Sequence, residues 1–420
     1  MAIHLPSRIR TFFRTWRPGP GIITGASDDD PSGIATYSQA GAMFGLNTLW
    51  TALVTFPFMA AIQEMCARIG LVTGEGLTGV IKRNYSKTLL WAVIIVSFPA
   101  ITLNIGADLA GMGAVANLLF PRVHANLFSL LFGLLLLFNI IALSYSRIAR
   151  ILKWLCLTLL AYLIVPFLVH QDWDEVIRRT FIPGITWDKE YLAIIVGILG
   201  TTISPYLFFW QTSVEVEELQ SRHLVVDKSL IREMRMDVRS GIFFSNLVFY
   251  FIILSTGSVL HDAHVGGIET VDQAASALRP LAGEFSYLLF ALGVMGTGLL
   301  AIPVLAGALS YMISEAMGWA EGLDKKFHEA KGFYIIVIVS ILAALAINFS
   351  GISPVRALIV TAVVYGMTAP LLIALIMHIC NNRKVMGDQV NGRWSNLLGG
   401  LGLLLMTAAA GLLAWQFLAA

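Results

Sequence analysis

The chain has 420 residues, of which 57% are hydrophobic and only 13% are charged, about half the charged share of a typical soluble domain. Its mean hydropathy is +0.76, so too few polar residues are present to cover the surface of a soluble globule of this size. The net charge of +2 provides no field that would attract nucleic acid. The composition therefore excludes a soluble enzyme and a nucleic-acid-binding module, and it predicts an integral membrane protein.

Eleven segments are apolar and long enough to cross a bilayer as helices, which takes about 20 residues. In chain order they span residues 20–44, 48–71, 88–117, 124–145, 150–169, 191–214, 241–260, 284–313, 333–349, 355–379 and 395–418. The connections between them are too short to hold a soluble domain, so we expect 1–420 to form one transmembrane domain. The charged segment 215–240 carries an apolar rhythm that is typical of a short amphipathic helix at the membrane surface.

The distribution of Lys and Arg predicts the orientation of the helices. Of the 28 Lys and Arg residues, 22 fall on one side when the connections are taken alternately, and 6 fall on the other. Positive residues accumulate in cytoplasmic loops. We therefore expect a multi-pass protein of the cell (inner) membrane, with the N-terminal tail 1–19 in the cytoplasm and the C-terminus outside.

The first and sixth segments are each interrupted near the middle by polar residues and a proline. The interruptions read Ser27-Asp28-Asp29-Asp30-Pro31-Ser32-Gly33 and Thr201-Thr202-Ile203-Ser204-Pro205-Tyr206. Matching interruptions in two five-helix sets of opposite orientation indicate an inverted-repeat transporter with its site at the bilayer midplane. We expect an all-α fold with a first repeat at 20–169, a second at 191–379 and an additional helix at 395–418.

Asp30 is the strongest candidate for a functional residue. A carboxylate at bilayer depth costs several kcal/mol unless it is paired or faces water, so such a residue is functional by default. The alternative is that the helix begins later and that the three aspartates cap it at the surface. Residues 21–27 would then be an apolar loop, so we favour a buried Asp30, with Asp28 and Asp29 lining a cavity or solvated.

These residues resemble the Nramp family of divalent-metal transporters. That family has Asp-Pro-Gly-Asn in its first helix and Met-Pro-His in its sixth, where this chain has Asp30-Pro31-Ser32-Gly33 and Ser204-Pro205-Tyr206. Similar stretches at 41–50, at Gln63, at 70–74 and at 107–110 extend the likeness over essentially the whole chain. The resemblance implies the LeuT-type (amino acid–polyamine–cation) fold, a five-plus-five inverted repeat with an eleventh helix.

The resemblance also implies a set of metal ligands. The family's aspartate, asparagine, methionine and backbone-carbonyl positions fall on Asp30, Gly33, Ser204 and Thr201. The amide oxygen and the thioether sulfur are therefore missing here. Two histidines fall on Tyr206 and Gln211, a helix-3 glutamate on Gly111 with Asp108 retained nearby, and a helix-10 glutamine on Ala362. We expect the ion pathway to be lined by Asp28, Asp29, Ser32, Asp108, Thr202, Tyr206, Gln211 and Asn246, although Asn246 has an interhelical hydrogen bond as an equal alternative.

The missing ligands indicate which ions the site prefers. Thioether sulfur favours transition metals, whereas oxygen ligands suit magnesium and manganese, and magnesium usually keeps several waters. The pattern is similar to the Nramp-related magnesium transporters. We expect a facilitator of Mg²⁺ and Mn²⁺ that works by alternating access, with the ion held at the unwound centres of both interrupted helices. Because the family's histidines and glutamate are absent, we expect weak or no proton coupling.

Other functions stay open at this point. They are a proton-coupled Mn²⁺/Fe²⁺ transporter, a carrier of an organic cation or amino acid on the same fold, and a passive channel. Asp30 would repel the carboxylate of an amino acid but not an amine. We find no paired catalytic set, nucleotide loop or haem motif, so we expect no enzymatic activity and no cofactor. The expected partners are the metal ion and the lipid bilayer, without nucleic acid, and the protein is expected to act as a monomer.

Three further expectations concern polar residues near the helix ends. Glu215, Glu217 and Glu218 either form an acidic vestibule that concentrates cations or are an ordinary solvated helix end. Glu64 and Arg68 are spaced to form an ion pair within one helix. The three cysteines, Cys66, Cys156 and Cys380, are expected to be buried free thiols.

Overall fold

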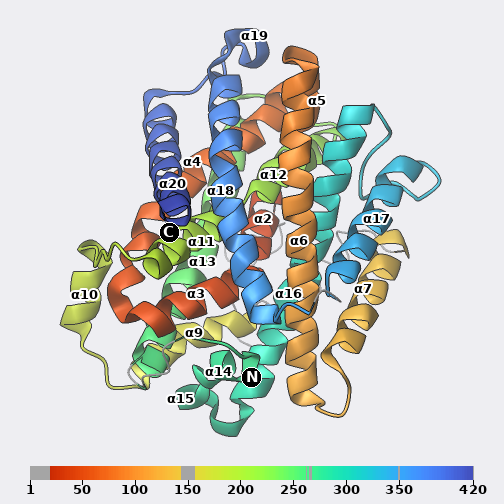
Figure 1. Ribbon diagram of the computed structural model, residues 1–420. Coiled ribbons are helices and arrows are strands. Elements are labelled where there is room, and N and C mark those ends of the chain that lie inside the picture. Colours follow the sequence, from red (N-terminus) through yellow and green to blue (C-terminus); the bar gives the residue numbers. More distant parts are fainter. Residues whose placement is uncertain (1–18, 143–156, 262, 264–266, 349–350, 420) are drawn as a thin grey trace, which may run out of the picture.

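The computed structural model describes residues 19–142, 157–261, 263, 267–348 and 351–419, and every regular element in these ranges is a helix. Figure 1 shows the long helices running roughly side by side, with short helices at both ends of the bundle. Eight described helices are long and apolar enough to cross a membrane. In addition to these eight, the bundle contains the shorter apolar helix Lys331–Ile347 and the two halves of the first interrupted segment.

The first repeat begins with two half-helices. Its elements are α2 (Pro20–Asp28), α3 (Pro31–Phe44), η1 (Gly45–Thr48), α4 (Trp50–Thr73), α5 (Leu77–Asn84), α6 (Lys87–Leu119) and α7 (Ala125–Ala142). The fifth predicted segment, 150–169, lies partly outside the described residues. Its described part consists of η2 (Leu157–Leu160), α9 (Ala161–Ile164) and η3 (Val165–Phe167). A short helix that we did not predict, α10 (Trp173–Phe181), follows it on the surface.

The second repeat also begins with a divided helix. Its elements are α11 (Lys189–Thr202), α12 (Pro205–Ser221), α13 (Lys228–Thr256), η4 (Gly257–His261), α14 (Val271–Ser276), α15 (Arg279–Ala282), η5 (Gly283–Phe285), α16 (Ser286–Met317), α17 (Lys331–Ile347) and α18 (Pro354–Asn381). After α19 (Arg383–Met386), the additional helix α20 (Arg393–Ala419) packs against α18 and α4.

The amphipathic surface helix predicted at 215–240 is absent. Instead, α12 continues to Ser221 and α13 begins at Lys228, so only a short link separates them. Its apolar rhythm has another cause, because Ile231 and Met234 are buried against the protein core. An amphipathic pattern does not distinguish a helix on the membrane from one that packs on protein.

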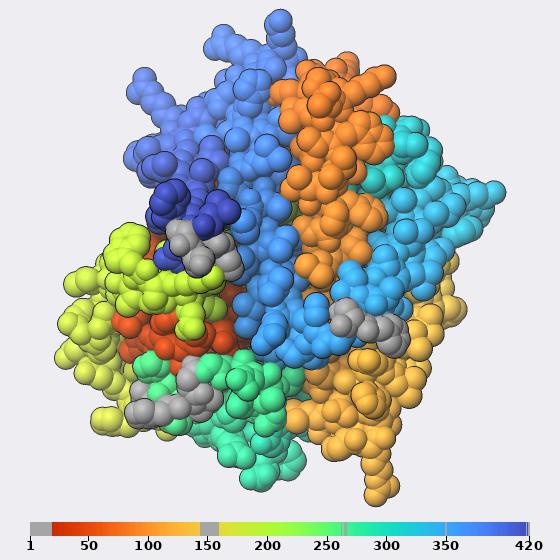
Figure 2. Space-filling model, viewed as in Figure 1, coloured from red at the N-terminus to blue at the C-terminus, as the bar shows by residue number. Residues whose placement is uncertain are grey.

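The divided helices lie at the centre of the bundle. α11 packs against α18, α12 against α4 and α16, and α2 against α13, while α6 contacts both α16 and α18. α6 and α18 form a continuous surface in front of these central elements (Figures 1 and 2). The outer helices turn large apolar side chains outward, as expected for a lipid-facing surface. Examples are Ile95, Leu131, Phe138, Val339 and Leu404.

The contact between α2 and α13 is made by glycines. A methyl group added at Gly25 would overlap the carbonyl group of Gly241, and one added at Gly241 would overlap the carbonyl oxygen of Gly21. Small residues of this kind allow two helix backbones to touch within a membrane. At the start of α2, the Asp237 carboxylate of α13 accepts hydrogen bonds from the backbone N–H groups of Gly19 (3.1 Å) and Gly21 (2.6 Å). The first half-helix is thus held closely on α13.

The helix packing tests two further predictions, the Glu64–Arg68 ion pair and the burial of the cysteine thiols. Glu64 does not pair with Arg68. Its carboxylate lies within 2.7 Å of Arg235 and 3.2 Å of Arg239, both on α13. Arg68 is buried and donates to the Asn391 side chain instead, because the link before α20 covers that face of α4. Cys66 and Cys380 are buried free thiols as expected, and Cys156 lies outside the described residues.

We predict that Gly25→Ala destabilises the fold, because the added methyl group meets backbone atoms that cannot rotate away. Overpacking of this kind costs about 1–3 kcal/mol. The measurement is thermal unfolding of the purified protein in detergent. Gly411→Ala is the matched control, since its added methyl group meets no atom within 4 Å. Equal melting temperatures for the two variants would contradict the close contact.

Candidate metal centre

The first interruption is a two-residue break between α2 and α3. α2 ends at Asp28, and Asp30 caps the start of α3. One Asp30 oxygen, Oδ1, accepts hydrogen bonds from the backbone N–H of Gly33 and from the Ser32 hydroxyl, both at 2.7 Å. Pro31 occupies the first helical position, where its missing N–H costs nothing. The local sequence thus places a carboxylate at the positive end of a half-helix.

The second interruption lies between α11 and α12. α11 ends at Thr202, and Ser204 precedes Pro205 at the start of α12. The Ser204 hydroxyl does not cap α12. It donates back to the carbonyl oxygens of Thr201 (2.5 Å) and Gly200 (3.2 Å) at the end of α11. Because a hydroxyl keeps its lone pairs when it donates, the Ser204 oxygen remains available as an acceptor.

The two interruptions meet at Gly33. An ideal Cβ atom at this residue would lie 3.3 Å from the Thr201 hydroxyl oxygen and 3.5 Å from Asp30 Oδ1. A hydrogen bond of 2.9 Å from the Tyr206 hydroxyl to the Ser27 carbonyl also joins α12 to α2. The four predicted ligand positions therefore converge, and all of the side-chain donors among them are oxygens.

α6 supplies a second layer around Asp30. The Asn104 amide donates to the other Asp30 oxygen, Oδ2, at 2.8 Å. Asp108, one turn further along, is fully buried close enough to Asp30 for their charges to interact. Neither Asp108 oxygen has hydrogen-bond geometry with a described residue. The predicted position of Asp108 at the centre is thus observed, and Asn104 fixes the orientation of the Asp30 carboxylate.

Asp28 and Asp29 are buried rather than solvated, with side chains only 0% and 5% exposed. The Ser245 hydroxyl of α13 lies 2.7 Å from Asp28 and 3.2 Å from Asp29. The solvated role and the surface-cap alternative are therefore wrong, because the close glycine contact brings α13 over the break. Within the described chain, the hydrogen-bond partners of the three aspartates are hydroxyl, amide and backbone N–H groups, not Lys or Arg. Such a group of carboxylates favours a cation.

The remaining predicted pathway residues have hydrogen-bond partners other than Asp30. The Thr202 hydroxyl is 3.2 Å from the Tyr37 hydroxyl within the core. Gln211, two turns along α12, is buried and donates to Glu215 at 2.8 Å. Asn246 takes its alternative role: it donates to the Ala52 carbonyl at 2.8 Å and thereby links α13 to α4.

Three residues at the centre were not among our predicted site residues. Asn104 was visible only as a polar neighbour of Asp108 on one face of an apolar helix. Ser245 gave no signal of its own. Tyr365 of α18 is fully buried, and its ring lies 5.9 Å from that of Tyr206. Ala362, the position suggested by the resemblance, abuts Gly200 through its backbone, so the tyrosine one turn later reaches the centre instead.

The centre is not a closed protein cage. In the described ranges, no group of three or more His, Cys, Asp and Glu side chains is arranged to hold a metal ion. The donors that converge are one hydrogen-bonded carboxylate, hydroxyl groups and the backbone of the two breaks. A site of this kind suits an ion that keeps part of its water shell and has to leave again.

Comparison with known proteins agrees with this geometry. The family model described as Nramp, natural resistance-associated macrophage protein-like, matches residues 21–416. A protein of Chromohalobacter salexigens named divalent metal cation transporter MntH is 27% identical over 384 residues, covering 89% of this chain and 85% of its own. A protein of Caldanaerobacter subterraneus with the same name is 24% identical over 388 residues, covering 91% of this chain and 88% of its own.

Solved structures share the fold. A crystal structure of the Eremococcus coleocola manganese transporter superposes with a TM-score of 0.73 at 19% identity, covering 97% of this chain and 87% of that one. The transporter MhsT, solved in complex with L-phenylalanine, gives a TM-score of 0.66 at 10% identity, with 94% and 99% covered. These likenesses confirm the expected LeuT-type arrangement of helices.

We predict that Asn104→Ala weakens metal binding, because the freed Asp30 carboxylate loses the donor that orients it. Removing a group that orients a metal ligand typically costs 10–100-fold in affinity. The measurement is calorimetric titration of the purified protein with Mn²⁺. Asn117→Ala is the control, since Asn117 lies on the same helix and donates to the Val123 carbonyl, away from the centre. Unchanged affinity in Asn104→Ala would contradict the assigned role.

Proposed function

The chain belongs to the Nramp family and transports divalent metal cations across a membrane, and we propose that its substrates include Mg²⁺ together with Mn²⁺. The observation that carries the proposal is the composition of the centre. Its side-chain donors at the four ligand positions are the oxygens of Asp30, Thr201 and Ser204, with Gly33 as the fourth position. The soft thioether donor of the family is replaced by a hydroxyl. Hard ions are therefore not disfavoured relative to transition metals.

The absence of a side chain at Gly33 supports the same proposal. A side chain there would project between the Asp30 carboxylate and the Thr201 hydroxyl. Without it, no side chain stands between these two oxygens, so both can face an ion or its waters when the centre opens. Magnesium sheds water reluctantly and is usually bound through one or two carboxylates, which is the arrangement that Asp30 offers.

We further propose that transport is uncoupled from protons or only weakly coupled. Tyr206 and Gln211 stand where the family carries histidines, and neither titrates near neutral pH. Gly111 faces a small apolar cavity that it shares with Pro31, Ile34 and Val115. Two charges that cross 100 mV release about 4.6 kcal/mol, so the membrane potential is a sufficient driving force for uptake.

Alternating access then moves the ion between the two sides of the cell membrane. In the proposed orientation the N-terminus is cytoplasmic, the C-terminus is outside, and one chain is the transporting unit. The divided helices would supply the moving parts, because the breaks separate α2 from α3 and α11 from α12. The burial of Asp28, Asp29 and Asp30 supports a closed arrangement in which neither side reaches the ion.

One observation favours a second candidate, a proton-coupled Mn²⁺/Fe²⁺ transporter. Asp108 is a buried carboxylate beside Asp30 that no hydrogen bond from a described residue satisfies. Such a group could take up a proton when the metal leaves. An organic-cation carrier is less well supported, because Tyr206, Tyr365 and the two helix breaks fill the space around Asp30.

We predict that Asp30→Asn abolishes saturable uptake of both Mg²⁺ and Mn²⁺ into proteoliposomes, because the charged ligand is lost while the side-chain volume is kept. Ion-sensitive dyes inside the vesicles measure the uptake, and a pH dye in parallel vesicles measures proton movement. Asp388→Asn, at an exposed position, should retain wild-type uptake. Proton flux that follows metal flux in a constant ratio would overturn the uncoupled mechanism in favour of the second candidate.

We predict that Ser204→Met combined with Gly33→Asn shifts selectivity toward Mn²⁺ by roughly tenfold, because it restores a soft donor and an amide. The Cβ of the asparagine would lie 3.3 Å from both Thr201 and Tyr37, so it alone requires these neighbours to shift by a few tenths of an ångström. The measurement is the ratio of Mg²⁺ to Mn²⁺ uptake rates in vesicles. An unchanged ratio in a folded double variant would show that these two positions do not set selectivity.

A further inference from the structure

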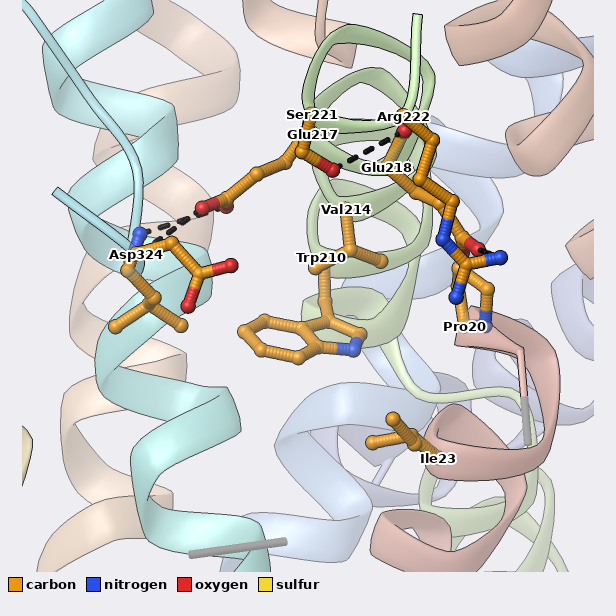
Figure 3. A pocket seen from close by; sticks show the side chains of 10 residues that line it. Pro20, Ile23, Trp210, Val214, Glu217, Glu218, Ser221, Arg222 and Asp324 are labelled. Carbon is orange, nitrogen blue, oxygen red and sulfur yellow. Dashed lines mark hydrogen bonds and ion pairs between the residues drawn. The ribbon is translucent and has the colours of Figure 1, made fainter. Parts of the chain in front are cut away.

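A second cavity lies away from the metal centre, at the end of the bundle where α12 stops. It encloses about 250 Å³ between the first turns of α2, the last turns of α12 and the link that follows α16. In Figure 3, the side chains of Trp210 and Val214 extend from α12 into the cavity. Ile23 of α2 and Asp324 of the link point into the same cavity. Trp210 is six residues beyond Ser204, so the cavity starts about 9 Å along the helix from the metal centre.

The walls of the cavity are of two kinds. Its floor is apolar and is made by Pro20, Ile23, Trp210, Val214 and Leu323. Its rim is charged and is made by three carboxylates and one guanidinium group, namely those of Glu217, Glu218, Asp324 and Arg222. Of the three glutamates for which a vestibule and a solvated helix end were both open, Glu217 and Glu218 line this cavity, whereas Glu215 is buried beside Gln211.

The three carboxylates are held differently. Glu217 accepts hydrogen bonds from the Tyr311 hydroxyl and from the backbone N–H groups of Leu323 (3.4 Å) and Asp324 (3.0 Å), so it fixes the link. Glu218 pairs with Arg222 at 2.6 Å. The Asp324 carboxylate points into the cavity in Figure 3. Among the described residues that line the cavity, three carboxylates face one guanidinium group, so this part of the rim carries an excess of negative charge.

We propose that this cavity binds a small organic cation, an amine or amidine with an apolar or aromatic body. The negative rim attracts the charged group, and the apolar floor takes the body, as in small-molecule sites that combine an apolar pocket with a few polar groups. The Trp210 indole adds a surface on which a cation can lie. A hydrated metal ion gains nothing from such a floor, so the ligand class differs from the transported ion.

Occupation of the cavity has a consequence for transport. Pro20 and Ile23 belong to the half-helix that leads to Asp30, while Trp210 belongs to α12 and Leu323 to the link. A ligand that touches all three holds α2 against its neighbours. In the proposed orientation the cavity opens to the cytoplasm, so a cytosolic organic cation slows the transporter from inside.

Direct binding of benzamidine to the purified full-length protein in metal-free detergent solution tests the proposal. Because no metal is present, the result does not depend on which ion is carried. Neutral benzamide, which has nearly the same shape, should not bind. Asp324→Asn should weaken benzamidine binding about tenfold, since one charge at the rim is lost. Arg222→Gln should strengthen it several-fold, since it removes a like charge and releases Glu218.

Opposite effects from two neighbouring rim residues cannot arise from partial unfolding. Glu329→Gln is the matched control, because Glu329 is an exposed acidic residue of the same link that does not line the cavity, and this variant should bind as wild type. Equal binding of benzamide, or equal weakening by Glu329→Gln, would overturn the proposal. Loss of benzamidine binding in Asp30→Asn would place the cation in the metal centre and would overturn it as well.

Discussion

Three adjacent carboxylates buried within a membrane protein are the constraint on which the rest of this structure depends. Charged groups at that depth require donors or a counter-ion. Three helices around the first break supply donors. The start of α3 donates a backbone N–H to Asp30, and α6 donates the Asn104 amide to the same carboxylate. The Ser245 hydroxyl of α13 donates to Asp28 and Asp29. None of these donors carries a charge, so the proposed divalent cation would offset two of the negative charges that the described donors leave unpaired.

Much of the site could be predicted from the sequence, because proline and aspartate inside apolar runs are rare and have few structural explanations. The breaks, Asp30 and the convergence of Gly33 with Thr201 followed from that pattern and from the family resemblance. The hydrogen-bond partners of the three aspartates from α6 and α13 did not follow from that pattern. The contacts of Asn104 and Ser245 depend on the rotation of α6 and α13 about their axes, which an uninterrupted apolar run does not specify. The same limit explains the wrong ion pair of Glu64 and the wrong surface helix at 215–240.

The two half-helices α2 and α12 are anchored in different ways. α12 is surrounded on all sides and packs bulky aromatic side chains such as Phe208 and Trp210 into the core. α2 is attached to α13 through closely packed glycine backbones and through hydrogen bonds with the Asp237 and Ser245 side chains. Glycine backbones can separate without the repacking of bulky side chains, although the hydrogen bonds of Asp237 and Ser245 have to break. The asymmetry makes α2 the element that is easier to displace when the ion has to leave.

The Asp237 carboxylate, which accepts hydrogen bonds from two N–H groups at the start of α2, opposes this displacement. Side-chain caps of helix starts stabilise by about 1 kcal/mol, and every opening has to break this one. A loss of 1.4 kcal/mol corresponds to about a tenfold change in an equilibrium. The Asp237 cap thus favours the attached position of α2 by up to about tenfold over a detached one.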